Sequence, residues 1–178
     1  RKESSAASDV YKRQVQHIIE KTFFYECEFF TPSKVFIPRA ETEILVDKVH
    51  DYIEKKKNKL KIVDLCTGSG CIVLSLAKKN PEHDFIGLDS SIDAINVSKI
   101  NSEKLKVVNV NFKKENAFEY DFKNVDIITC NPPYLAINEI ETLENSVKNH
   151  DPLDALTDHY DGLLSVSYTH LRAHETKA

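Results

Sequence analysis

The sequence predicts an α/β fold in which a parallel sheet of about four strands is preceded by a short β-hairpin or linker. Two observations predict it. Short, nearly continuous apolar runs alternate with longer segments of helical period, which is the pattern of βαβ units. A glycine-containing turn joins the first of these apolar runs to the helix after it, at the place where such sheets bind ligands. We therefore expect a buried sheet that is covered on both faces.

Each element follows from its local pattern. The aromatic stretch 22–30 suits a strand or hairpin, and 41–57 carries apolar residues on one helical face. These apolar residues are Ile44, Leu45, Val49, Tyr52 and Ile53. The expected strands of the sheet are 61–65, 85–89, 106–112 and 125–130, and the expected helices are 71–80, 92–105 and 138–149.

The two ends of the chain differ from the patterned part between them. Residues 4–14 and 166–178 show neither a helical nor a strand period and resemble translated cloning or adapter junctions. We expect non-native tails at both ends, with a linker or hairpin and a partial domain between them. The predicted divisions are a tail at 1–14, a linker or hairpin at 15–38, a partial domain at 39–164 and a second tail at 165–178.

Composition bounds the class of protein. The chain has 178 residues, 41% of them hydrophobic, and a formal net charge of -4, which gives no overall attraction to nucleic acid. No apolar run approaches the roughly 18 residues that span a bilayer, so we expect a cytoplasmic protein. The four cysteines form no C-x-x-C pair, and we expect them to be small buried hydrophobes in a reducing compartment.

The turn "DLCTGSGC" at 64–71 has the character of a nucleotide-binding loop. Gly68 and Gly70 permit positive φ and let backbone N–H groups approach an anion at the start of the next helix. Val73 stands where the dinucleotide fingerprint requires a third glycine, and no Gly-Lys-Ser/Thr motif follows. The turn therefore indicates a nucleotide of another kind, with a tight strand-to-helix turn as the alternative.

Two acids stand at the ends of the first two strands of the sheet. In a mononucleotide layout the second, Asp89, accepts hydrogen bonds from both ribose hydroxyls, and Asp64 has a less direct role. A solvated strand-end aspartate is the alternative reading of each. After the last predicted strand, Pro132 and Pro133 cannot donate ladder hydrogen bonds, so the backbone leaves the sheet there as a stiff arm.

Four stretches carry a resemblance to a known family. "DLCTGSGC" looks like the S-adenosylmethionine loop of class I methyltransferases, which have a Rossmann-like sheet. Together with "FYECEF" (24–29), "IPRAETE" (37–43) and "NPPY" (131–134), it resembles the release-factor glutamine methyltransferases. NPPY alone is shared with adenine-N6 DNA methyltransferases, so the segment 37–43 is the narrower signal. The likeness runs from about Val15 to Leu163.

The resemblance implies S-adenosyl-L-methionine as cofactor and N5-methylation of the glutamine in the Gly-Gly-Gln motif of peptide chain release factors. It implies a cofactor site formed by Asp64, Cys66, Thr67, Gly68, Ser69, Gly70, Asp89, Asn116 and Asn131. It implies a catalytic segment formed by Asn131, Pro132, Pro133 and Tyr134. The chain departs from the family at several positions. Family members usually have glycine where Glu26 and Cys66 stand, proline where Ala40 stands, and aspartate where Asn116 stands. The family's Glu-Pro pair after the fourth strand is Asp151 and Pro152 here.

The NPPY segment suits methyl transfer to an amide nitrogen, whose lone pair is delocalised. If the Asn131 side-chain oxygen and the Pro132 carbonyl each accept one N–H of the substrate NH₂, the nitrogen is positioned and its developing positive charge is stabilised. Tyr134 would pack against the planar amide. A rigid strand-to-loop exit is the alternative for this segment.

Class I sheets have seven strands with the fourth next to the first, and this chain supplies four. We therefore expect a fold truncated after about four strands, inactive alone and binding the cofactor weakly or not at all. The enzymatic rival is an adenine or guanine amino methyltransferase acting on nucleic acid, which needs a basic face. The non-enzymatic rival is an inactive binding module on the same fold.

Overall fold

The computed structural model describes residues 15–16, 18–142, 152–158 and 160–161. The chain divides into two compact units, Arg1–Asn131 and Pro132–Ala178, which are described separately. The predicted tails, 1–14 and 165–178, lie outside the described residues, so their assignment stays a prediction.

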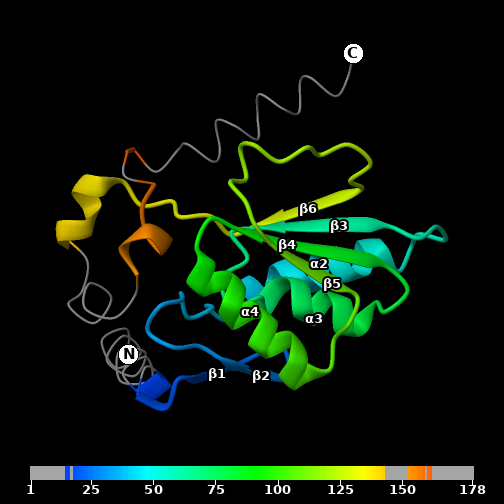
Figure 1. The fold of residues 1–178 in the computed structure, drawn as a ribbon, viewed down its shortest axis with the longest axis horizontal. Helices are drawn as coiled ribbons and strands as arrows, with labels where there is room; N and C mark the ends of the chain where they lie inside the picture. Colours follow the sequence, from blue (N-terminus) through cyan, green and yellow to red (C-terminus); the bar gives the residue numbers. More distant parts are fainter. Residues whose placement is uncertain (1–14, 17, 143–151, 159, 162–178) are drawn as a thin grey trace, which may run out of the picture. The chain divides into compact units, whose positions relative to one another are not determined.

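The first unit is built on a four-stranded parallel sheet, in the order β5-β4-β3-β6 (Figure 1). The strands are β3 (Lys61–Leu65), β4 (Asp84–Asp89), β5 (Val110–Lys114) and β6 (Ile127–Cys130), with α3 (Cys71–Lys79) and α4 (Ile92–Leu105) as the first two crossovers. The last strand pairs with the first, as expected, and the predicted α/β class is confirmed. Each paired strand therefore brings its carboxyl end to the same edge of the sheet.

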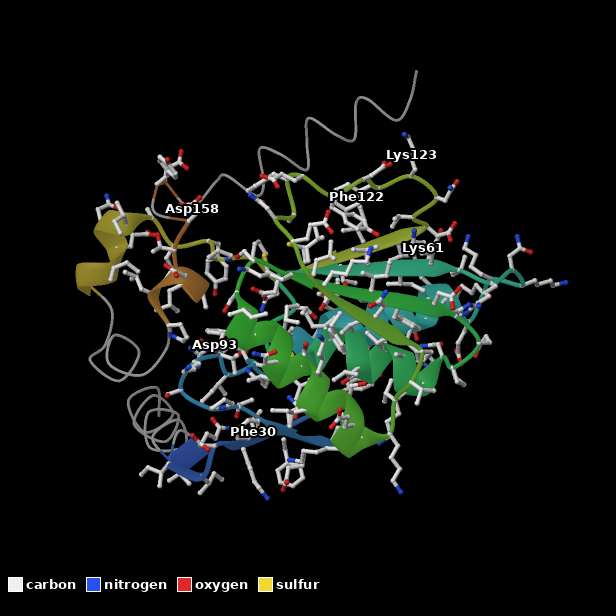
Figure 2. The ribbon with its side chains drawn as sticks, viewed as in Figure 1. Phe30, Lys61, Asp93, Phe122, Lys123 and Asp158 are labelled. Carbon is white, nitrogen blue, oxygen red and sulfur yellow. The ribbon has the colours of Figure 1, made fainter. Side chains whose placement is uncertain are left out.

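Different structures cover the two faces of this sheet. Helices α3 and α4 pack on the face that carries Ile62 and Phe85 (Figure 1). The opposite face carries Val63, Leu65 and Leu88, and aromatic residues of the β5–β6 connection cover it. Among these, the rings of Tyr120 and Phe122 meet edge to face with centroids 5.1 Å apart, and Figure 2 labels Phe122 there.

A two-stranded antiparallel hairpin precedes the sheet. It consists of β1 (Lys21–Phe24) and β2 (Cys27–Phe30) and is followed by helix α2 (Thr42–Ile53). Its two turn residues, Tyr25 and Glu26, both have positive φ (47° and 64°), as in a type I′ turn. Tyr25 donates its N–H to Glu43 (3.0 Å) and its hydroxyl to Asp47 (2.6 Å), so α2 stabilises this turn even though it has no glycine.

Helix α2 differs from its prediction in length and in the face it buries. It ends at Ile53, and the N–H of Glu54 caps it on the His50 carbonyl before the lysine-rich residues begin. Val46 and Ile53 are its buried residues, whereas Ile44 is 60% exposed and Tyr52 50% exposed. The predicted face was therefore wrong at both of these exposed positions.

The third strand of the sheet begins later than predicted because the preceding helix uses the intervening residues to end. Lys106 adopts a left-handed conformation (φ 57°), and its N–H bonds to the carbonyls of Glu103 and Ser102. The N–H of Val107 also donates to the Ser102 carbonyl (3.0 Å). This is a helix-ending turn normally made with glycine, so the pattern alone did not reveal it.

The second unit contains short 3₁₀ segments, η1 (Ile137–Thr142) and η2 (Leu153–Ala155). A parallel bridge joins Leu135 to Thr157. The α-helix predicted at 138–149 is a 3₁₀ helix where the structure describes it, and 143–149 lie outside the described residues. In the part of the chain that is described, no helix is long and apolar enough to cross a membrane.

Candidate functional site

The turn between β3 and α3 has a left-handed backbone at three positions. Cys66, Gly68 and Gly70 have φ values of 55°, 56° and 80°. The turn is fixed by backbone bonds, because Thr67 donates its N–H to Leu88 O on β4 (2.9 Å) and Gly70 donates to Thr67 O (2.8 Å). The loop is therefore ordered by the neighbouring strand.

The two glycines of this turn have different surroundings. A Cβ at Gly70 would lie 3.0 Å from Leu74 Cδ1 and 3.1 Å from Ser98 Cβ, so this glycine allows α3 and α4 to pack closely. A Cβ at Gly68 would have its nearest neighbour at 4.0 Å, the Cys66 carbonyl. The backbone at Gly68 therefore borders open space, which is what a ligand-contacting glycine requires.

Asp64 is completely buried beneath the turn. Its two carboxylate oxygens accept hydrogen bonds from the hydroxyls of Thr67 and Thr129, both at 2.7 Å. Burial raises the pKa of Asp64 to about 7, while the two hydroxyl donors oppose that shift. Asp64 thus ties the turn to β6, and each of its oxygens is bonded to a buried hydroxyl.

Asp89, at the end of β4, is half-buried beside the turn. Its Oδ2 accepts the Gly68 N–H and its Oδ1 accepts the Ser91 N–H, both at 2.9 Å. Burial raises its pKa, and these backbone donors lower it. Since a carboxylate oxygen can accept two hydrogen bonds, each oxygen of Asp89 keeps acceptor capacity for a ligand. The two backbone hydrogen bonds fix the orientation of the carboxylate, and both oxygens can still accept a further hydrogen bond.

The structure brings the last residue of β6 to the start of the turn. Cys130 pairs in register with Leu65, so Asn131, which follows Cys130, and Cys66, which follows Leu65, leave the sheet at the same edge. Asn131 is half-buried. Pro132, Pro133 and Tyr134 belong to the second unit, where Tyr134 is 61% exposed, and their predicted position beside the turn stays a prediction.

Asn116 follows β5 and is exposed. Its side-chain oxygen accepts the N–H of Phe118 (3.0 Å), which makes a local turn. The preceding Glu115 donates its N–H to the Asp89 carbonyl (3.0 Å), so Asn116 directly follows a residue that is hydrogen-bonded to the end of β4. Ser69, another predicted site residue, is buried, and its hydroxyl has no hydrogen-bond partner.

Sequence reasoning missed Asn101, a completely buried residue of α4. Its amide donates to the carbonyls of Phe30 and Ser69, both at 2.9 Å, and its oxygen accepts the Phe30 N–H at 2.7 Å. It therefore ties the glycine turn to β2, where Figure 2 labels Phe30. A signal was present, because Asn101 continues the buried stripe of Ala94, Val97 and Ser98 along the helix.

Within the described residues, no group of three or more His, Cys, Asp or Glu side chains could hold a metal ion. The arrangement is instead a parallel-sheet edge with an ordered glycine turn and an oriented carboxylate on the adjacent strand. This combination is suited to a nucleoside-containing ligand.

Comparison with known proteins identifies the class. A family model described as a methyltransferase domain matches residues 56–159, which is more than half of the chain. The chain belongs to this family. The residues that it matches include the glycine turn, both strand-end acids and the NPPY segment.

Within that class, the chain is similar to curated release factor glutamine methyltransferases. It is 39% identical over 157 residues to the one from Thermodesulfovibrio yellowstonii, covering 85% of this chain and 55% of the relative. It is 41% identical over 158 residues to the one from Bacillus subtilis, covering 84% and 54%. The predicted resemblance is confirmed, and the chain spans about half the length of these relatives.

The fold also matches solved structures. The hMettl16 catalytic domain in complex with MAT2A 3'UTR hairpin 1 aligns with a TM-score of 0.61 at 16% identity, covering 80% of this chain and 54% of that chain. At this identity the likeness concerns the fold alone, and it agrees with the predicted Rossmann-like sheet.

Proposed function

We propose that this chain forms part of an S-adenosyl-L-methionine-dependent methyltransferase that modifies the glutamine amide nitrogen in the Gly-Gly-Gln motif of peptide chain release factors. The identity of about 40% to release factor glutamine methyltransferases carries the proposal, because it extends over more than four-fifths of the chain. We place the protein in the cytoplasm, where release factors act.

The residues present fit this cofactor. Asp89 offers two oriented carboxylate oxygens with spare acceptor capacity, which suits the two hydroxyls of a ribose. Gly68 presents open backbone beside them. Asn116 is the candidate contact for the adenine ring, and Thr67, Ser69 and Asp64 hold the turn in shape. The bound cofactor supplies a methyl group on a positively charged sulfur.

Asn131 is the proposed substrate-binding residue. Its side-chain oxygen accepts one N–H of the substrate amide, and the next carbonyl along the chain, that of Pro132, accepts the other. Two acceptors hold the nitrogen in position and stabilise the positive charge that develops on it. The proton can leave after transfer, so the reaction needs no histidine or cysteine at the nitrogen.

Substitution of Asn131 tests the proposal in the full-length protein that carries this sequence. We expect Asn131→Ala to lower methyl transfer to a release factor by about 100-fold or more, while the affinity for S-adenosylmethionine changes only a few-fold. Transfer is measured with a radiolabelled methyl group, and binding is measured by calorimetry. Asn111→Ala, which removes an exposed amide on β5, is the matched control.

The same assay separates the competing functions. Adenine-containing RNA and DNA are offered beside the release factor and a variant of it with the motif glutamine changed to alanine. Labelling of the nucleic acids, or equal labelling of both release factors, would contradict the proposed substrate. Binding of the release factor without any transfer would favour the inactive binding module.

A further inference from the structure

Two of the four cysteines lie next to each other at the carboxyl ends of neighbouring strands. Cys130 ends β6 and pairs in register with Leu65, the last residue of β3, and Cys66 follows Leu65 directly. Strands pair about 4.8 Å apart and advance about 3.3 Å per residue, so a diagonal step of one residue separates Cα atoms by roughly 6 Å. Disulfides commonly join Cα atoms about 4.4–6.8 Å apart.

The side chains of this pair meet and can be reached from solvent. The thiols of Cys66 and Cys130 lie close enough to interact, because the Cys66 side chain raises the pKa of Cys130. Cys66 is half-buried and Cys130 is exposed. The expectation that all four cysteines are buried hydrophobes is therefore wrong for these two, because both stand where the sheet ends and the backbone turns outward.

The other two cysteines have different environments. Cys27 and Cys71 are both buried. Cys27 Sγ accepts a hydrogen bond from Lys78 Nζ (3.4 Å) on α3. Burial raises the pKa of Cys71 to about 12, which keeps that thiol protonated and unreactive. They provide internal controls within the same chain.

We propose that Cys66 and Cys130 form a redox-active thiol pair that closes to a disulfide in exchange with small disulfides such as glutathione disulfide. The Cys66 sulfur, after losing its proton to solvent, attacks one sulfur of the small disulfide, whose S–S bond breaks and releases a thiolate. The deprotonated Cys130 sulfur then attacks Cys66 in the mixed disulfide and releases the second thiolate. The pair loses two electrons and two protons, and the small disulfide is reduced to two thiols.

The contact between the two thiols sets the order of these steps. The neighbouring Cys66 thiol is the first cause of a raised pKa at Cys130, so Cys130 holds its proton more tightly. The attack on the oxidant therefore falls to Cys66, and ring closure by Cys130 accelerates as the pH rises.

The crosslink joins two segments with assigned roles. Cys66 opens the glycine turn, and Cys130 immediately precedes Asn131. A disulfide fixes the start of the cofactor loop to the start of the substrate-binding segment. That consequence rests on the proposed function, whereas the crosslink itself does not.

Mass spectrometry of the full chain tests the pair directly. The chain is equilibrated in glutathione buffers from reducing to oxidising, free thiols are alkylated, and the digest is analysed. We expect a peptide pair linked through Cys66 and Cys130 in oxidising buffer, with a loss of two hydrogens that dithiothreitol reverses. Cys27 and Cys71 should be alkylated only after unfolding. Alkylation of both Cys66 and Cys130 in oxidising buffer, or separate glutathione adducts on each, would overturn the proposal.

Single-thiol variants separate closure from simple reactivity. Cys130→Ser should trap glutathione on Cys66, since the resolving thiol is gone, and Cys27→Ser should leave the crosslink intact. If Cys130→Ser fails to fold by circular dichroism, the wild-type peptide map decides the question alone.

A second readout uses the wild-type chain. We expect its thermal midpoint to rise by roughly 5–10 °C on oxidation and to return with dithiothreitol, because the bond closes a long loop. An unchanged midpoint in the crosslinked chain would contradict the predicted constraint. S-adenosylmethionine titration of the reduced full-length protein that carries this sequence is separate from both readouts. A failure to bind there would count against the proposed function and leave the crosslink standing.

Discussion

The carboxyl ends of β3 and β4 carry an aspartate each, on neighbouring strands of one sheet, but the two acids are held in opposite ways. Asp64 is fully buried and takes its donors from the side chains of Thr67 and Thr129. Asp89 is half-buried and takes its donors from backbone N–H groups of Gly68 and Ser91. Asp64, with its buried side-chain donors, stabilises the turn. Asp89, with its backbone donors at a half-buried position, can still accept hydrogen bonds from a ligand.

Removing the buried acid should have the largest effect on stability. Asp64→Ala leaves the hydroxyls of Thr67 and Thr129 buried without their acceptor, and we expect the free energy of unfolding to fall by about 2 to 5 kcal/mol. Urea unfolding followed by circular dichroism measures it. Asp64→Asn is the control, because an amide can still bond to both hydroxyls. Equal losses in the two variants would contradict the role assigned to these hydrogen bonds.

The same contrast predicts a dependence of stability on pH. Asp64 has a folded-state pKa of about 7, against 3.8 for an unperturbed carboxyl. Between these values the folded state holds a proton that the unfolded state has lost, so stability falls as the pH rises from about 4 to about 7. The loss is at most about 4 kcal/mol. Asp64→Asn should flatten this slope in urea titrations. A slope of the opposite sign, or one unchanged by the substitution, would refute the assignment.

The rim acid should affect binding more than folding. In the full-length protein, Asp89→Ala removes the proposed ribose acceptor. We expect the affinity for S-adenosylmethionine to fall by about 10- to 100-fold, equivalent to roughly 1.5–3 kcal/mol for a charge-assisted contact. The expected loss of folding stability is about 1 kcal/mol, because backbone donors at a half-exposed site can turn to water. Calorimetry and urea unfolding of one variant measure both. A larger effect on stability than on binding would contradict the ligand-binding role proposed for Asp89.

The sequence located both acids and assigned Asp89 the more direct role, but it did not reveal how Asp64 is held. Both follow apolar runs, and the strands and helices from 61 to 105 were predicted to within about a residue because short turns link strongly patterned elements. The difference depends on Thr129, which lies 65 positions from Asp64 in the chain and reaches it only through the pairing of β6 with β3. Long-range register is also what brings Cys130 to Cys66. A local pattern carries no information about either contact.

The smallest expected effect on stability comes from the backbone conformation at the two strand ends. The end of β3 turns through Cys66 at a φ of 55°, a left-handed conformation that costs a non-glycine residue about 1 kcal/mol. The end of β4 continues through Ser90, which has no positive φ and is exposed. We expect Cys66→Gly to stabilise the reduced chain by up to about 1 kcal/mol and Ser90→Gly to destabilise it by a similar or smaller amount.

Paired urea unfolding curves in dithiothreitol measure both substitutions under conditions where no disulfide forms. Opposite signs would show that the two strand ends differ in backbone strain as well as in their acids. If Cys66→Gly destabilised the chain instead, the thiol contact with Cys130 would outweigh the strain that its backbone conformation imposes. The left-handed residue would then be retained at this position for its side chain, despite the cost to the backbone.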